Sequence, residues 1–270
     1  MSGDSHARPE PVRLNKLLAG MGVGSRRHCD RLIAEGRVSV DGARAAGLGA
    51  KALPGARIEV DGRPVNAGGL SPCGGAPHTY VLLYKPLGVI SSADDQFGRK
   101  TVVDLVAGGI NKRVFPVGRL DYNSAGLILL TDDGGYAYRA THPKFGVQKT
   151  YEVVCDRPPD GPALERLRSG VALDDGYMTA PAGVSRDAKN PALLRITLRE
   201  GRNRQIRRML EACGYGVKAL TRVAIGGLGA KGLAPGGWRA LNEAEANLIF
   251  QERSHIIDSG VCSRAKRNEA

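Results

Sequence analysis

Residues 118–126 read Gly-Arg-Leu-Asp-Tyr-Asn-Ser-Ala-Gly, and this stretch decides the fold more than any other part of the chain. Apolar, strand-like runs enter it at 114–117 and leave it at 127–130. A loop that joins two strands can project a side chain into a cleft, so Asp121 is a candidate reactive carboxylate. For an isolated motif of this kind the alternative is a hairpin connection whose aspartate only accepts backbone hydrogen bonds.

Composition limits the class of protein. The 270 residues allow one large domain, or a small and a medium one. No run of about 18 apolar residues occurs, so we expect no membrane span. The polar start of the chain has no apolar region of the signal-peptide type, and the five cysteines are scattered without a Cys-x-x-Cys pair. This cysteine pattern argues against a disulfide framework and a zinc site, and it indicates a cytoplasmic protein.

The net charge of +12 predicts a polyanionic partner. Lysine and arginine bind phosphates and release counterions, which is the basis of salt-dependent nucleic-acid binding. Residues 11–60 hold nine Lys and Arg against four Asp and Glu, so this part of the chain is itself basic.

Changes in composition divide the chain into five segments. Residues 66–78 are rich in glycine and proline, as in a flexible linker. The predicted order is a disordered leader at 1–10, a small domain at 11–65, the linker at 66–78, a large domain at 79–250 and a basic flexible tail at 251–270.

The small domain resembles the S4 RNA-binding domain. Residues 14–18 carry leucines at helical spacing, Ser25 can cap a second helix, and 37–42 alternate as a strand ending in an Asp-Gly turn. An ion pair between Arg26 and Asp30 on the second helix is the structural alternative to RNA contact at Arg26. The resemblance implies RNA contacts at Arg13, Lys16, Ser25, Arg26, Arg27 and Arg31.

The large domain carries a series of motifs. The Gly-Arg-Leu-Asp stretch at 118–121 is preceded by Lys-Pro-Leu-Gly at 85–88 and followed by Arg-Glu-Gly-Arg-Asn-Arg-Gln-Ile-Arg-Arg at 199–208. The last piece is Ala-Leu-Thr-Arg-Val-Ala-Ile-Gly at 219–226. In this order the motifs resemble those of the ribosomal RNA pseudouridine synthases of the RsuA/RluB type. Residues 85–106 and 117–134 are most similar to the large-subunit (RluB) group, with the small-subunit (RsuA) group as the near alternative.

This resemblance assigns roles to residues of this chain. Asp121 is implied to be the catalytic carboxylate and Arg207 its salt-bridge partner. Tyr151, in the alternating strand-like segment 148–154, is implied to pack against the target base, with an ordinary tyrosine on a half-buried strand face as the alternative. Leu220 is implied to lie beside the uracil, although a plain core leucine is the alternative. The implied substrate contacts further include Arg119, Lys85, Arg204 and Arg208. The motif that begins at Lys85 is interpreted as structural support near the cleft, with Lys85 as a candidate phosphate contact.

The local pattern at 203–213 predicts a helix that Asn203 caps, with Arg204 and Arg208 on its outer face and Arg207 flanking the apolar stripe. A surface pair of Arg207 with Glu211 is the alternative there.

Two other chemistries were weighed from the residues. A glycosidase-like pair of Asp121 with Asp132 or Asp133 is disfavoured, because Asp133-Gly134 predicts a turn and a strand of about five residues would separate the carboxylates. Residues 227–232 fit Gly-x-Gly-x-x-Gly but are followed by Pro-Gly-Gly instead of a helix. We therefore expect no cofactor, nucleotide or otherwise, and no metal.

The predicted fold class is α+β, with the S4 module followed by a mixed, mainly antiparallel sheet around a central catalytic cleft. The implied activity is conversion of a specific uridine of ribosomal RNA, of the 23S type, to pseudouridine. The implied partner is ribosomal RNA or a pre-ribosomal particle, bound by a monomer away from membranes. The alternatives are a 16S enzyme and a non-catalytic RNA-binding assembly factor.

Overall fold

A computed structural model describes residues 10–65, 77–230 and 232–252. The predicted leader, linker and tail thus lie outside the described residues, apart from a few residues at their ends. The chain divides into a small compact unit, made mainly of residues up to Thr79, and a larger unit that begins at Tyr80.

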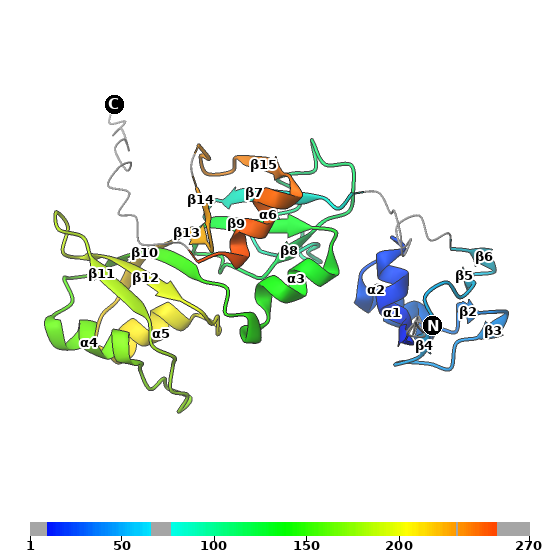
Figure 1. Ribbon diagram of the computed structural model, residues 1–270, viewed down its shortest axis with the longest axis horizontal. Coiled ribbons are helices and arrows are strands. Elements are labelled where there is room, and N and C mark those ends of the chain that lie inside the picture. The colour runs from blue at the N-terminus through cyan, green and yellow to red at the C-terminus, as the bar shows by residue number, and fades with distance from the viewer. Residues whose placement is uncertain (1–9, 66–76, 231, 253–270) are drawn as a thin grey trace, which may run out of the picture. The chain divides into compact units, whose positions relative to one another are not determined.

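The small unit packs two helices against short strands (Figure 1). Its helices are α1 (Leu14–Gly20) and α2 (Arg26–Ala34). Ser25 caps α2 by accepting a hydrogen bond from the amide of His28 at 3.1 Å, as the sequence predicts. The strands are β1 (Val12–Arg13) paired with β4 (Lys51–Ala52), and a four-stranded sheet in the order β3 (Ala43–Arg44), β2 (Val38–Val40), β5 (Ile58–Val60), β6 (Arg63–Pro64).

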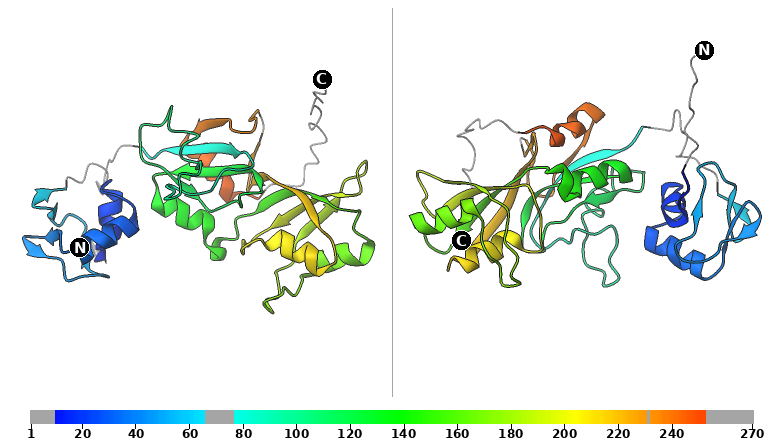
Figure 2. Two further views of the ribbon diagram at one scale, coloured as in Figure 1. Left: turned by 180° about the vertical axis from the view of Figure 1, so that it is seen from behind. Right: turned by 60° about the horizontal axis from the view of Figure 1, so that its bottom comes forward.

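The large unit is built on one mixed sheet with the main order β11-β12-β10-β13-β9-β7-β15 (Figures 1 and 2). All of its named pairs are antiparallel except β13 with β9, so the predicted mixed, mainly antiparallel sheet is confirmed. The strands are β7 (Tyr80–Lys85), β8 (Phe115–Val117), β9 (Ala125–Thr131), β10 (Lys149–Cys155), β11 (Gly183–Arg186), β12 (Leu193–Leu198), β13 (Val217–Ile225), β14 (Leu228–Gly229) and β15 (Trp238–Leu241).

Helices cover the two halves of this sheet and give each half its own core. The β10–β12 half packs with α4 (Gly161–Ser169) and α5 (Gln205–Ala212) through buried residues such as Leu167 and Leu210. The β7–β9 half packs with α3 (Gly134–Thr141) and α6 (Glu243–Asn247) through residues such as Tyr136 and Ala246. Short 3₁₀ turns follow α3 and α6, namely η1 (Pro143–Phe145) and η2 (Leu248–Phe250).

The parallel contact between β9 and β13 joins the two halves. Gly126 on β9 lies opposite Arg222 on β13 with a φ of 108°. A Cβ at this position would overlap the backbone of Arg222, so only glycine allows the strands to approach this closely. The close approach of β9 and β13 therefore explains why glycine occupies position 126.

Two local predictions for the large unit need correction. The Asp-Gly pair at 133–134 was predicted to form a turn, but α3 begins at Gly134. The helix predicted after Asn203 begins at Gln205, and its N-cap is Arg204 in the left-handed region with a φ of 50° and no side-chain cap.

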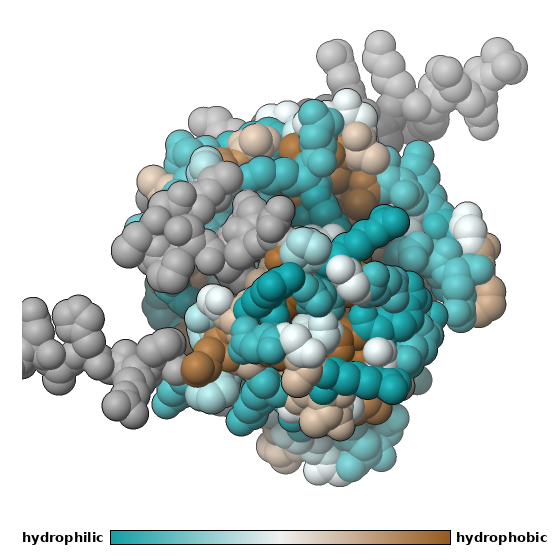
Figure 3. All heavy atoms as spheres, turned by 90° about the vertical axis from the view of Figure 1, so that its right-hand side faces the viewer, coloured by the Kyte–Doolittle hydropathy of each residue, from teal (hydrophilic) through white to brown (hydrophobic). Residues whose placement is uncertain are grey.

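Figure 3 shows the hydropathy of one face of the molecule. Hydrophilic residues cover most of the face drawn in Figure 3, with only small apolar areas between them. Among the residues that the structure describes, no helix is both long enough and apolar enough to cross a membrane.

Candidate active site

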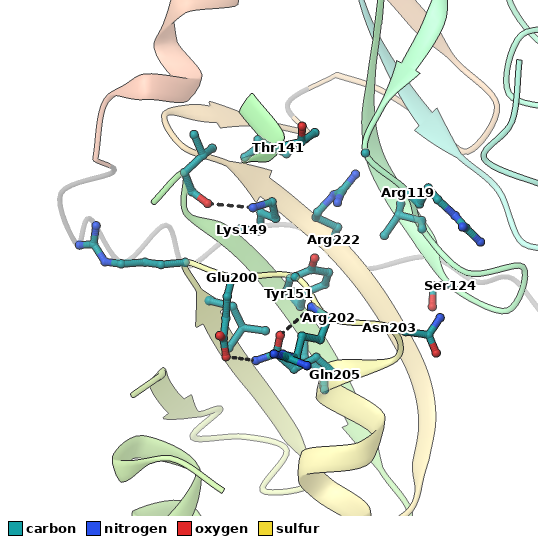
Figure 4. A pocket seen from close by; sticks show the side chains of 18 of the residues that line it. Arg119, Ser124, Thr141, Lys149, Tyr151, Glu200, Arg202, Asn203, Gln205 and Arg222 are labelled. Carbon is teal, nitrogen blue, oxygen red and sulfur yellow. Dashed lines mark hydrogen bonds between the residues drawn. The ribbon is translucent and has the colours of Figure 1, made fainter. Parts of the chain in front are cut away.

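A pocket of about 390 Å³ opens in the large unit where the two halves of its sheet meet. Its walls come from the loop before β9, from β10 and β13, and from the basic segment that precedes α5. Figure 4 shows these side chains converging on one space. Of the residues predicted from the sequence, those lining the pocket are Asp121, Tyr151, Leu220, Arg119 and Arg204.

The loop that carries Asp121 is held at both of its ends. The hydroxyl of Ser91 donates to the carbonyl of Leu120 at 2.9 Å and accepts from the amide of Leu120 at 3.0 Å. The amide of Gly88 donates to the carbonyl of Tyr122 at 3.0 Å. The 85–91 segment thus supports the loop, and the half-buried Asp121 carboxylate lines the pocket in a fixed backbone setting.

Lys85 fits the predicted structural support near the cleft but not the candidate phosphate contact. It is fully buried, and its ammonium donates to the carbonyls of Pro86 at 2.9 Å and Ser124 at 2.8 Å. Burial lowers the pKa of Lys85 to about 8, although the Asp121 carboxylate partly opposes this shift and Arg222 adds to it. The predicted phosphate contact is therefore incompatible with this structure, and Lys85 is a buried cation near Asp121.

Arg207 also differs from its prediction. Its guanidinium donates to the carbonyl of Asn123 at 2.9 Å and to that of Val217 at 3.2 Å. It forms no ion pair with Asp121 or Glu211 among the described residues, so the expected salt bridge is absent from this structure. Burial lowers the pKa of Arg207, the neighbouring Arg204 acts in the same direction, and the charge of Asp121 opposes both. Arg207 thus ties the Asp121 loop to β13 through the backbone and acts on the carboxylate only through its field.

Tyr151 and Leu220 face the pocket from adjacent strands. Tyr151 on β10 is the cross-strand partner of Arg222 on β13, and Leu220 comes two residues before Arg222. Leu220 is buried and Tyr151 half-buried, so the pair presents an aromatic and an aliphatic surface to anything that enters.

The basic segment before α5 is held by Glu200. This carboxylate accepts hydrogen bonds from the side chain of Gln205, from the hydroxyl of Tyr177 at 2.9 Å and from the amide of Ala180 at 3.1 Å. The guanidinium of Arg202 stacks on the ring of Tyr177, 3.2 Å from its centroid. Asn203 was predicted to cap this helix, but the backbone amide that is bonded here is that of Arg202. It donates to the side-chain oxygen of Gln205 at 3.0 Å.

Arg208 points away from the pocket toward two carboxylates. Its Nε donates to Asp174 at 2.6 Å, and its Nη2 lies 2.9 Å from Asp175. Binding of RNA by Arg208, which the sequence predicts, would have to displace these ion pairs.

The S4-like unit presents its predicted RNA contacts to solvent. Arg26 forms no ion pair with Asp30, because the Asp30 carboxylate accepts from the buried Asn15 amide at 3.0 Å. This bond ties α1 to α2. The predicted contacts, all exposed, are Arg13, Lys16, Ser25, Arg26, Arg27 and Arg31.

Two cations of the pocket were missed from the sequence. Lys149 and Arg222 line it from β10 and β13. The signal was available, since side chains two apart in a strand share a face, and these residues lie two positions from Tyr151 and Leu220. The described residues hold no cluster of three or more His, Cys, Asp or Glu side chains that could bind a metal ion.

Comparison with known proteins gives a consistent assignment. Residues 79–212 match a family model described as RNA pseudouridylate synthase, and residues 12–58 match the S4 domain. An RNA pseudouridine synthase of Aquifex aeolicus (strain VF5) is 41% identical over 247 residues, covering 89% of this chain and 94% of the relative. The ribosomal large subunit pseudouridine synthase B of Bacillus subtilis (strain 168) is 42% identical, covering 90% and 97%. A crystal structure of a pseudouridylate synthase superposes with a TM-score of 0.61 at 27% identity, covering 88% of this chain and 99% of that one.

Proposed function

The chain belongs to the RNA pseudouridine synthase family, and on that premise we propose that it isomerises a specific uridine of large-subunit ribosomal RNA to pseudouridine. The observation that carries the proposal is the position of Asp121, whose carboxylate lines a pocket walled by Tyr151 and Leu220. A uridine must leave its stack to reach such a pocket, and a flipped base is commonly held between aromatic and apolar side chains.

The chemistry begins at the glycosidic bond. The Asp121 carboxylate either attacks C1′ or removes the proton at C2′, and both routes release the uracil from the ribose. The uracil then turns and C5 joins C1′, which breaks the Asp121–C1′ bond in the first route and returns the proton to C2′ in the second. The C5 proton leaves, and N1 gains a proton. The reaction is an isomerisation, so it requires no external oxidant or group donor.

The cations around Asp121 help to fix its position. Lys85 and Arg207 both lie within the electrostatic field of this carboxylate. Each also binds a carbonyl of the loop, at Ser124 and Asn123. The reactive carboxylate is therefore positioned before the substrate enters.

Exposed basic side chains bind the rest of the RNA. Arg119, Arg199 and Arg204 are exposed around the pocket, where they suit the phosphates that flank a flipped nucleotide. The exposed arginines of the S4-like unit add a second binding surface. A monomer in the cytoplasm that acts on ribosomal RNA or a pre-ribosomal particle completes the proposal.

Pseudouridine mapping tests this function. Ribosomal RNA from cells with and without the gene is treated with carbodiimide and read by primer extension. We expect one stop in large-subunit RNA to disappear and to return with the wild-type gene but not with Asp121→Asn. The matched control is Asp187→Asn, the same substitution on the exposed loop between β11 and β12, which should restore the stop.

The other outcomes are equally informative. Loss of a small-subunit stop would keep the reaction and change the substrate. No lost stop, together with no tritium release by the purified protein from 5-tritiated ribosomal RNA, would refute the function and leave an RNA-binding protein.

A further inference from the structure

Arg222 is a buried cation with unused hydrogen-bonding capacity. Its side chain is 3% exposed and lines the pocket. Its Nε donates to the carbonyl of Leu127 at 2.6 Å, but its buried Nη2 has no hydrogen-bond partner. No carboxylate forms an ion pair with it among the described residues. Burial of an unpaired charge costs free energy of folding. The buried guanidinium of Arg222 would therefore be stabilised by a negatively charged group that enters the pocket with the substrate.

A second cation lies next to it. The ammonium of Lys149 donates to the carbonyl of Val147 at 3.0 Å, and burial together with the charge of Arg222 lowers the pKa of Lys149 to about 8. Figure 4 shows the Lys149 and Arg222 side chains side by side above the Tyr151 ring. Arg222 also acts electrostatically on Lys85. This part of the pocket therefore holds more positive charge than the Asp121 carboxylate can balance.

The position of these cations favours one part of the substrate. Phosphates of an RNA strand stay at the surface, where exposed arginines such as Arg119 and Arg204 can bind them. Arg222 instead lies inside the pocket, beside Tyr151 and two residues from Leu220, which are the walls for the base. The group that would meet it is the uracil ring.

We propose that Arg222, supported by Lys149, binds the uracil as the glycosidic bond breaks and stabilises the negative charge that the ring then carries. The inference rests on the proposed function. In either route from Asp121, the electron pair of the N1–C1′ bond leaves with the uracil, giving an anion delocalised over N1, O2 and O4. The charge disappears when C5 bonds to C1′ and a proton reaches N1, so the cations bind most strongly between these two steps. Fixed cations in a water-poor pocket stabilise a developing charge efficiently because they need no reorganisation.

The test varies the leaving group. Single-turnover cleavage is measured with wild type and Arg222→Met on two RNAs, one with uridine and one with 5-fluorouridine at the target. Fluorine withdraws electrons, so the fluorinated uracil leaves more readily and needs less stabilisation. We expect the rate on uridine RNA to fall by about 10²–10³-fold, the scale of losing one stabilising donor at an oxyanion. On fluorinated RNA the fall should be at least about tenfold smaller, and RNA affinity should stay within about threefold of wild type, because the contact forms only as charge develops.

Controls separate this role from folding. Arg195→Met removes an exposed arginine of β12. This variant should cleave both RNAs at the rates of the wild type. If Arg222→Met does not fold, Lys149→Met gives the same test, since the Lys149 side chain makes a single hydrogen bond to a nearby carbonyl.

Equal losses on both RNAs would overturn the inference, as would weaker RNA binding with an unchanged single-turnover rate, which indicates a phosphate contact. A wild-type protein that modifies no ribosomal RNA would instead refute the proposed function itself.

Discussion

Replacement of the buried Lys85 by methionine should change how the stability of the large unit depends on pH. Burial lowers the pKa of Lys85 from 10.5 to about 8. At 1.36 kcal/mol per pKa unit, the charged form therefore costs the folded state about 3 kcal/mol. Between these two pKa values the unfolded chain binds more protons than the folded one, so stability rises with pH in that window.

The Lys85→Met variant lacks this proton linkage. From about pH 7.5 to about pH 10, we expect the free energy of unfolding of the wild type to rise relative to the variant by about 2 kcal/mol. The variant also loses the hydrogen bonds to Pro86 and Ser124, at a cost of about 1–3 kcal/mol for each unsatisfied group, but this loss is independent of pH. Only the difference in slope reports on the buried ammonium.

Guanidinium unfolding followed by tryptophan fluorescence measures this slope. Trp238 is the only tryptophan of the chain and lies on β15 opposite Leu83 of β7, the strand that ends at Lys85. The exposed Lys189→Met variant is the matched control and should follow the wild type at every pH. Parallel curves for Lys85→Met and the wild type would refute the lowered pKa and with it the assignment of Lys85 as a buried cation.

Two further predictions address the geometry of the site. Gly126→Ala should destabilise the large unit by about 3 kcal/mol or more and abolish activity, since the new Cβ would overlap the backbone of Arg222 at a positive φ. The control Gly108→Ala, which has no atom near the new Cβ, should be neutral in the same fluorescence assay. Equal effects of the two substitutions would contradict the close approach of β9 and β13. Glu200→Ala should release the basic segment before α5 and raise the KM for RNA by about tenfold, with a smaller effect on kcat. The control Glu165→Ala on α4 removes the same charge and should leave the KM unchanged. An unchanged KM in both variants would show that the basic segment does not depend on Glu200.

The sequence was sufficient to predict the fold class and to single out the candidate carboxylate that lines the pocket. Apolar runs on both sides of 118–126 predict the strands that the structure shows as β8 and β9. Ser25 correctly predicts where the second helix of the small unit begins. The order of the motifs is sufficient to recognise the family. Each motif consists of residues that are adjacent in the chain, so it can be read without the tertiary structure.

Some predictions failed because they concerned partners that are distant in sequence. Arg207 was expected to pair with Asp121, but its hydrogen bonds go to the carbonyls of Asn123 and Val217. Lys85 fits its predicted place as support near the cleft, but its candidate contact with phosphate does not agree with its burial against a loop almost forty residues away. A side chain's charge and spacing do not reveal which backbone groups surround it once strands from different parts of the chain pair.

The sequence by itself thus determined the fold class, the strands on both sides of 118–126 and the choice of Asp121 as the candidate nucleophile or base. Only the tertiary structure decided the electrostatics around it. The register of β10 with β13 sets Tyr151 opposite Arg222, and the parallel contact with β9 buries Arg222 beside Lys149. The alternation of side chains between the two faces of a strand is local and can be read from the sequence. The register between strands and the burial of side chains depend on contacts between segments far apart in the chain. Register and burial together fix the charge that a bound uridine would meet.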